Sequence, residues 1–301
     1  MTRTLRHSSQ VLAFGLLLGA AAGCKEVPPE PAAPPFDELP APTIEELVVR
    51  RVEQDVARAD PSASFWRDVP RGSVALLAQP MVTPRPEATN TEAVIVQAVH
   101  DGKAVAFRVV WRDPEPSVGG RLGEFSDALA LQFPSNGKDE TPVMMGSAEA
   151  PVHIYHWRAQ YQRDEEKGKP EMATLYPNMA VDMYAMDFKE APGGTKAQKE
   201  SFLPARTLGN PQAFRKQAVD EIVARGFGTS AVQAAGAAQG RAAWKDGRWA
   251  LVLTRPLAVP ERSVLKAGTE SYLAFAVWQG GKGEVGSRKS VTMAWLPVKL
   301  Q

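Results

Sequence analysis

Residues 92–113, EAVIVQAVHDGKAVAFRVVWRD, hold two runs of β-branched and other apolar residues on either side of the turn signal His100-Asp101-Gly102. Two such runs joined by a short turn favour a pair of antiparallel strands. Similar runs occupy residues 73–80, 127–134, 151–161, 248–257, 270–281 and 289–300. We therefore expect a mainly β protein, an antiparallel β-sandwich with long loops and few short helices, rather than a βαβ fold.

The composition allows a sizeable core and excludes one class of partner. The chain has 301 residues, of which 44% are hydrophobic, and a formal net charge of +1 without a long run of either sign. A chain of this length and hydrophobic content can form one large domain or two small ones. Because there is no basic stripe, nucleic acid is not an expected partner.

The N-terminus has the features of an export signal. Two arginines precede an apolar stretch at 11–23, which is shorter than the ~20 residues of a membrane-spanning helix. The stretch ends in AAGC, which resembles the bacterial lipoprotein signal. We expect residues 1–23 to be removed and Cys24 to carry a lipid, with an ordinary secretory signal cleaved nearby as the alternative. The lipid would anchor the protein on the periplasmic side of a membrane, and Lys25 favours the outer membrane.

Cys24 is the only cysteine in the sequence, and this excludes several kinds of cofactor site. An internal disulfide, a C-x-x-C-H haem attachment, a cysteine-ligated iron–sulfur cluster and a zinc ribbon all need more thiols. The common phosphate-loop, dinucleotide, H-E-x-x-H and G-x-S-x-G motifs are also absent. An enzyme acting alone is therefore disfavoured, and any cofactor must be held by other side chains.

Two segments separate Cys24 from the sandwich. Residues 24–42 are rich in proline, which favours an extended tether. Residues 43–60 begin with Thr43 and Glu46, which fit a capping box. Apolar residues at helical spacing follow at Ile44, Val48, Val52 and Val56. We therefore expect an amphipathic helix at 43–60.

The sandwich domain is expected to cover residues 64–301. Its strand pattern is interrupted between residues 159 and 241 by polar sequence rich in glycine and proline. Long excursions of this kind in a compact domain are typical of functional or disordered loops. The carboxylates of the sequence RDEEK at 163–167 fit a solvated surface better than a paired acid and base.

Two of the four histidines lie in the run VHIYHWR at 152–158. Strand alternation places His153 and Trp157 on one face and His156 on the other, so the two histidines cannot both bind one metal from a regular strand. A zinc site would need His100, His153 and His156 to converge. A zinc-dependent enzyme is therefore the weakest of three hypotheses.

Eight blocks of sequence from about Trp66 to the C-terminus resemble a known family. In order they are VALLAQP, VWRDPEPS, FSDALALQFP, PVMMG, APVHIYHWRA, GFGT, AAWKDGRWALVLTRPL and AFAVWQGGKGEVGSRKSV. Their joint order is similar to that of the haem-binding gamma subunits of ethylbenzene dehydrogenase and dimethyl sulfide dehydrogenase. The resemblance implies an immunoglobulin-like or DOMON-like β-sandwich that binds one non-covalent haem b.

The same resemblance implies a set of haem-binding residues. In that family a methionine sulfur and a lysine amine bind the iron. By position, the methionine is Met145, with Met144 as the close alternative, and the lysine is Lys289. Trp157 and Arg288 are further candidate cofactor contacts, although Trp157 also fits a core aromatic residue and Arg288 a surface ion pair.

These two ligand types have physical requirements. Lysine binds iron only as the neutral amine, so Lys289 must be desolvated enough to lose its proton well below the usual pKa of about 10.4. The thioether of Met145 is a soft neutral donor that favours ferrous iron. With both axial positions filled, no place is left for oxygen or substrate, which fits electron transfer.

The leading hypothesis is an exported, lipid-anchored b-type cytochrome that relays single electrons. Its partners would be a molybdopterin catalytic subunit and an iron–sulfur subunit, as the resemblance implies, or a c-type cytochrome. The chief alternative is a lipoprotein that kept the sandwich, lost the cofactor and binds another ligand or partner. These hypotheses differ in whether Lys289 points into a pocket facing Met145 or toward solvent.

Overall fold

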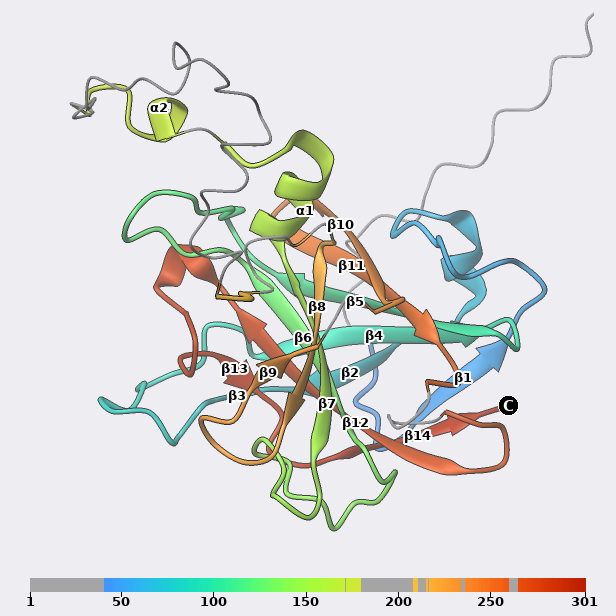
Figure 1. The fold of residues 1–301 in the computed structure, drawn as a ribbon. Coiled ribbons are helices and arrows are strands. Elements are labelled where there is room, and N and C mark those ends of the chain that lie inside the picture. Colours follow the sequence, from blue (N-terminus) through green and yellow to red (C-terminus); the bar gives the residue numbers. More distant parts are fainter. Residues whose placement is uncertain are drawn as a thin grey trace, which may run out of the picture. The chain divides into compact units, whose positions relative to one another are not determined.

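The described part of the chain contains fourteen strands, whose arrangement is shown in Figure 1. The computed structural model describes residues 41–170, 172–179, 208–210, 215, 217–233, 236–259 and 265–301, all within one unit at 33–301. The predicted signal at 1–23, Cys24 and residues 24–40 of the predicted tether lie outside the described residues.

The strands are β1 (Leu47–Arg51), β2 (Gly72–Ala75), β3 (Leu77–Ala78), β4 (Ala93–His100), β5 (Ala104–Arg112), β6 (Ala128–Pro134), β7 (Val152–Arg158), β8 (Val219–Ala224), β9 (Ala231–Val232), β10 (Gln239–Lys245), β11 (Arg248–Pro256), β12 (Glu270–Trp278), β13 (Ser290–Val291) and β14 (Leu296–Leu300). The helices are α1 (Ala159–Lys167) and α2 (Met172–Leu175), with 3-10 turns at Ser64–Asp68 and Gly280–Lys282. This confirms the predicted fold class, a mainly β protein with few short helices.

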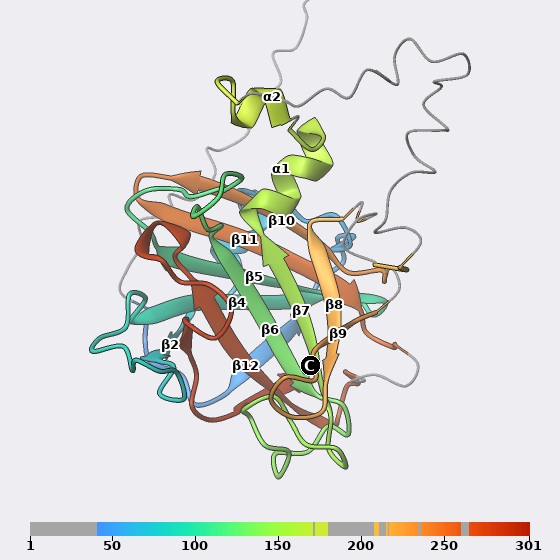
Figure 2. The same cartoon turned by 60° about the vertical axis from the view of Figure 1, so that its left-hand side comes forward.

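The strands form two layers that are joined along one edge. One layer has the order β10-β11-β5-β4, the other has the order β12-β6-β7-β8-β9, and β1 and β14 connect them. In Figure 2 the strands β6, β7 and β8 lie in front of β4, β5 and β11 and cross them steeply. Pairing within both layers is antiparallel, as predicted for a sandwich.

The hairpin at 92–113 supplies the centre of the first layer. Its strands β4 and β5 pair from Ile95 with Val110 to His100 with Val105. Alternation directs Phe107 and Trp111 into the core between the layers, where they join inward-facing side chains of β6, β7, β11 and β12. The outer face of this hairpin packs against a second apolar cluster that includes Trp66. The hairpin is therefore buried on both faces, which explains its continuous apolar runs.

Residues 43–60 do not form the predicted amphipathic helix. Residues 47–51 form β1, which pairs in parallel with β14 through Leu47 and Val298 and with β4 through Arg50 and Val99. Leu47 and Val49 point into the core with a period of two. Hydrogen bonding to two strands distant in sequence outweighs the local helical spacing, because β structure depends strongly on tertiary context.

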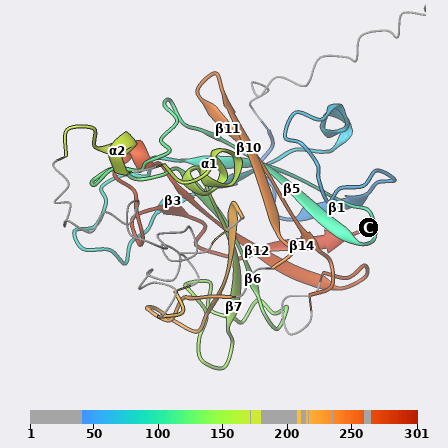
Figure 3. The same cartoon turned by 45° about the horizontal axis from the view of Figure 1, so that its top comes forward.

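The excursion at 159–241 contains more regular structure than the sequence indicated. The helix α1 begins directly after β7, and β8 and β10 extend the two layers. Gln162 on α1 accepts a hydrogen bond from Ala242 N and donates one to Ala242 O on β10, at 2.8 and 2.9 Å. Figure 3 shows α1 end-on beside β10. None of the helices in the described ranges is long and apolar enough to span a membrane.

Candidate functional site

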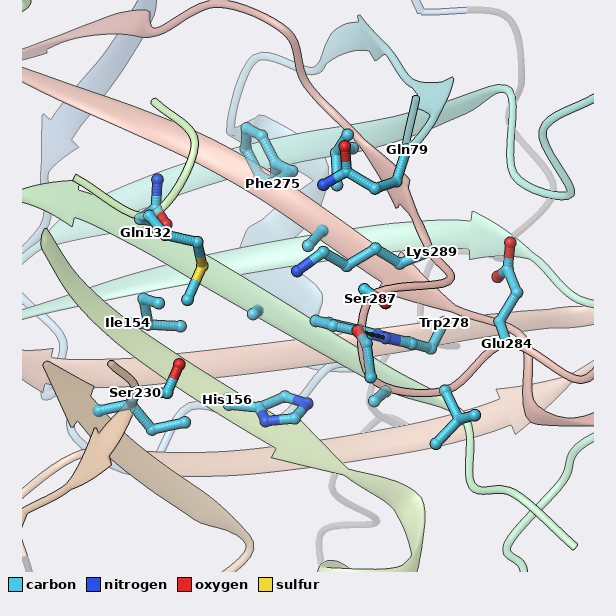
Figure 4. A pocket seen from close by; sticks show the side chains of 18 of the residues that line it. Gln79, Gln132, Ile154, His156, Ser230, Phe275, Trp278, Glu284, Ser287 and Lys289 are labelled. Atoms are coloured by element: carbon cyan, nitrogen blue, oxygen red, sulfur yellow. Dashed lines mark hydrogen bonds between the residues drawn. The ribbon is translucent and has the colours of Figure 1, made fainter. Parts of the chain in front are cut away.

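A cavity of about 660 Å³ opens on the outer face of the second layer, on β12, β6 and β7 (Figure 4). This volume lies within the range of small-molecule and cofactor sites. Small side chains form its base: Ala128, Ala130, Ala274 and Ala276. They alternate with Leu129, Leu131, Leu273 and Phe275, which belong to the core. The alternation of alanine with large residues along β6 and β12 therefore leaves a shallow, flat surface on the outer face.

The strand register defines rows of side chains across this surface. In one row Ala276 on β12 pairs with Ala130 on β6, which pairs with His156 on β7. In the next row Trp278 pairs with Ala128, which pairs with Arg158. Because the middle strand carries only alanine in both rows, groups from β7 and β12 can approach each other over it.

One wall of the cavity is the loop that carries the two methionines. Met145 has a φ of 68° and Gly146 also has a φ of 68°, a left-handed conformation that is uncommon for methionine. The backbone of Met145 is held on both sides, since its N–H donates to Val143 O at 3.1 Å and its carbonyl accepts from Gly226 N at 2.8 Å. A Cβ atom at Gly146 would lie 2.6 Å from Ala150 O. The loop therefore fixes Met145 in a strained conformation, as is common at functional sites.

The two methionines differ in their surroundings, although both line the cavity. The thioether of Met144 accepts a hydrogen bond from Gln79 Nε2 at 3.8 Å. Met145 packs against the apolar cluster of the outer face, which includes Ile154 and Trp278. Of the two side chains, Met145 is the one that packs against this apolar cluster.

Lys289, directly before β13, lines the same cavity as the two methionines. Its carbonyl accepts a hydrogen bond from Gln79 N at 3.0 Å, and its Nζ lies 4.9 Å from the centre of the Trp278 ring. Figure 4 shows the ammonium group extending into the cavity above Trp278. The residue as a whole is half-buried, but burial of the ammonium group lowers the pKa of Lys289 to about 8.

A buried carboxylate holds the connection that carries Lys289. Glu284, 7% exposed, accepts hydrogen bonds from Gln279 N at 2.8 Å and from Asn90 Nδ2 at 3.0 Å. The hydroxyl of Ser290, next to Lys289, lies 3.5 Å from the same carboxylate. Burial raises the pKa of Glu284. These contacts fix both ends of the segment between β12 and β13.

A second buried carboxylate holds the adjacent loops. Asp127 accepts hydrogen bonds from Gly280 N at 2.8 Å and from Trp249 Nε1 at 3.0 Å. Asp113, at the end of β5, lies beside it. Burial, followed by the charge of the neighbouring Asp127, raises the pKa of Asp113, and burial also raises the pKa of Asp127. The pair therefore favours a shared proton over two charges.

His156 is a site residue that the sequence analysis did not select. Its imidazole lines the cavity, is 7% exposed and packs against Trp278 with the ring centres 4.8 Å apart (Figure 4). Within the described ranges, Nε2 has no hydrogen-bond partner. Burial, and then the charges of Arg158, Lys289 and Arg215, lower the pKa of His156 well below its usual range. In the sequence, strand alternation places His156 on the face opposite to the core-facing residues of β7. This alternation is the sequence feature that could have indicated His156 as a site residue.

Other predicted residues lie outside the cavity. Trp157 is fully buried between the two layers because it faces away from His156, and its Nε1 donates to Gln162 Oε1 at 3.0 Å. Arg288 is directed toward Pro84 O, at 3.5 Å near the surface. Neither Trp157 nor Arg288 lines the cavity. Arg158, which is two residues after His156, lines the cavity instead.

The histidines do not form the zinc site that was considered. His100 Nε2 donates a hydrogen bond to Gln301 O at 2.7 Å, away from the cavity, and His153 stacks against Tyr155 on the core side of β7. In the part of the chain that the structure describes, no three His, Cys, Asp or Glu residues are placed to bind one metal ion. The hypothesis of a zinc-dependent enzyme is not supported.

The fold and the cavity define a β-sandwich with a pocket of small-molecule size on the outer face of one sheet. The chain belongs to the ethylbenzene dehydrogenase family, whose sequence profile matches residues 63–290. This confirms the resemblance drawn from the eight sequence blocks.

Three relatives match most of the chain. A protein of Haloferax mediterranei named as a respiratory nitrate reductase heme subunit is 24% identical over 82% of this chain and 70% of its own length. The chlorate reductase subunit gamma of Ideonella dechloratans is 26% identical over 80% of each chain. The dimethylsulfide dehydrogenase subunit gamma of Rhodovulum sulfidophilum is 24% identical over 80% of this chain and 75% of its own.

The chemistry of the cavity lining fits a haem group. The small alanine side chains leave room for a planar ring, and the lining offers a thioether and an amine. Methionine sulfur is an established haem ligand, and an amine binds iron only when it is neutral. The lowered pKa of Lys289, which results from burial alone, brings the neutral form within reach near neutral pH.

Proposed function

We propose that this chain is an exported, lipid-anchored b-type cytochrome that relays single electrons between a redox enzyme and a respiratory carrier. The observation that carries the proposal is that Met145 and Lys289 line the same cavity, and that burial lowers the pKa of Lys289 to about 8. Met145 and Lys289 are selected by the family pattern in the sequence, whereas the cavity and the burial of the Lys289 amine are features of the fold.

We assign Met145 as the sulfur ligand in preference to Met144. The Met144 thioether already accepts a hydrogen bond from Gln79, while Met145 packs against the apolar cluster of the outer face. Bound haem would supply one-electron chemistry at its iron. Lys289 would present a neutral amine, and Met145 a neutral sulfur. With Met145 and Lys289 both holding the haem, the site would be suited to electron transfer and not to binding of oxygen or substrate.

The surroundings support a relay between proteins. Met81, Phe227 and Val285 are large apolar side chains at the cavity that are 67%, 61% and 45% exposed. Exposed apolar patches at a site commonly mark contact with another protein. Because the relatives are named as subunits of nitrate reductase, chlorate reductase and dimethylsulfide dehydrogenase, we propose a molybdopterin catalytic subunit and an iron–sulfur subunit as partners, with a c-type cytochrome as the alternative.

The proposed location follows from the N-terminal sequence. Cys24 would carry the lipid, residues 24–42 would act as the tether, and the domain would lie on the periplasmic side of the outer membrane. Labelling of cells with a radioactive fatty acid tests this: label should be retained by the wild-type chain and lost in Cys24→Ser. Label in both proteins would contradict the lipid anchor.

Spectroscopy of the chain reconstituted with haem tests the ligand assignment. We expect a six-coordinate low-spin spectrum for the wild type and for the matched control Met144→Leu. Met145→Leu and Lys289→Ala should each lose one ligand and give a high-spin or altered spectrum. An unchanged spectrum in both variants, or no Soret band in the wild type, would overturn the proposal and favour a lipoprotein that binds another ligand.

A further inference from the structure

We infer that His156 and Arg158 form a carboxylate-binding subsite within the cavity, which holds a propionate group of the bound ring. The identity of the ligand rests on the proposed function, whereas the subsite itself rests on the residues of β7. Both side chains lie on the outer face of this strand, in adjacent rows of the sheet. They are separated from β12 only by Ala130 and Ala128.

The first argument is the unpaired ring nitrogen of His156. The residue is 7% exposed, and Nε2 has no hydrogen-bond partner among the described residues. A buried polar atom without a partner is destabilising, so such atoms in native proteins usually have a function or a bound partner. Because His156 lines the cavity, a ligand in the cavity can supply the missing partner.

The second argument is the charge of the surroundings. Burial lowers the pKa of His156, and the positive charges of Arg158, protonated Lys289 and Arg215 lower it further. Asp220 is the cross-strand neighbour of His156 on β8, but it forms an ion pair with Arg215 at 3.1 Å. The neighbours on β6 and β12 are uncharged. Arg158 stays charged when Lys289 is a neutral amine, so it favours an anion over a cation near Nε2 of His156.

The third argument is the orientation of the imidazole ring. His156 packs against Trp278 at 4.8 Å between ring centres, and Trp278 is itself fixed because its Nε1 donates to Gly286 O at 3.0 Å. Lys289 Nζ lies 4.9 Å from the same indole ring. One tryptophan therefore positions both the imidazole and the amine in a single cavity.

Binding of esterified and free ligands tests the inference. The dissociation constants of haem and of metal-free protoporphyrin IX are measured for the purified chain, each as the free diacid and as the dimethyl ester. Loss of a hydrogen bond to a charged group should weaken binding of both free acids to His156→Leu by about 10-fold or more. Binding of both esters should be the same in His156→Leu and the wild type, and the haem-bound spectrum should keep its ligand pattern.

The matched control is His153→Leu, which removes an imidazole from the core side of the same strand. It should bind the acids and esters as the wild type does, provided that thermal unfolding shows a folded protein. Arg158→Leu should behave like His156→Leu.

Three results would overturn the inference. Equal weakening for acids and esters would mean that His156 only shapes the cavity, and unchanged affinities would mean that it makes no contact. A haem spectrum altered in His156→Leu and not in Lys289→Ala would make His156 an iron ligand. A different result would show that only the proposed function is wrong. In that case the haem spectrum would not change in Met145→Leu or Lys289→Ala, while His156→Leu would still bind the free acids more weakly than the wild type does. The metal-free porphyrin then still tests the subsite.

Discussion

Replacement of Lys289 by methionine should stabilise the chain in the absence of haem. The folded chain lowers the pKa of Lys289 from 10.5 to about 8 through burial, so a charged amine is held in an unfavourable place at neutral pH. The difference of about 2.5 pH units corresponds to roughly 3 kcal/mol at about 1.4 kcal/mol per unit. Because the residue is half-buried, we expect about 2 kcal/mol after discounting for solvent screening.

The effect should depend on pH with a defined sign. Between pH 8 and 10.5 the unfolded chain binds more protons at Lys289 than the folded chain does, so wild-type stability gains from this residue as pH rises. Urea unfolding of the haem-free chain at a series of pH values gives the free energy of unfolding. The free energy of unfolding of Lys289→Met should exceed that of the wild type most at pH 7, and this gap should close toward pH 10.5. The exposed Lys138→Met is the control, and its free energy of unfolding should equal that of the wild type at each pH.

A gap that stays constant with pH would refute this reasoning, because it would reflect packing rather than charge. A wild type more stable than Lys289→Met at pH 7 would also refute it.

The same pKa of about 8 implies that deprotonation of Lys289 at pH 7 costs haem binding about 1.4 kcal/mol, or about 10-fold in affinity. An unshifted lysine would cost more than 1,000-fold at the same pH, by about the same rule.

Two further substitutions test other parts of the site. Gly146→Ala should lower the free energy of unfolding by about 1–3 kcal/mol more than Gly137→Ala, since both glycines have positive φ but only Gly146 lacks room for a Cβ atom. Equal losses in chemical denaturation would show that backbone conformation alone matters. Because the pKa of Asp113 is raised, the folded chain binds more protons than the unfolded chain above the usual carboxyl pKa, and the wild type should lose stability as pH rises. Asp113→Asn should remove this loss. Equal pH slopes for this variant and the wild type would contradict the shared proton of Asp113 and Asp127.

Local patterns predicted the parts of the fold that depend on local structure. The β4–β5 hairpin follows from two apolar runs and a turn, and the alternation along β7 correctly separated His156 from Trp157. The error at 43–60 has a non-local cause. There β1 is stabilised by β4 and β14, whose pairing residues lie about 50 and 250 positions away in the sequence. No periodicity within residues 43–60 could have indicated these partners.

The candidate site shows the same division. The family pattern selected Met145 and Lys289, and both line the cavity. The cavity forms because the alanines of β6, Ala128 and Ala130, lie in register beside Ala276 on β12. The register between two strands that are distant in the sequence cannot be read from one sequence. The unpaired nitrogen of His156 is likewise a property of the assembled sheet.

The position of β1 has a mechanical consequence. It is the first strand of the described chain, and it is hydrogen-bonded along one edge to β14 and along the other to β4. A pulling force applied through the residues that precede it would act along the strand axis, so the backbone hydrogen bonds would be loaded together in shear instead of being opened one at a time. A domain held by its N-terminus would therefore resist being unravelled from that end.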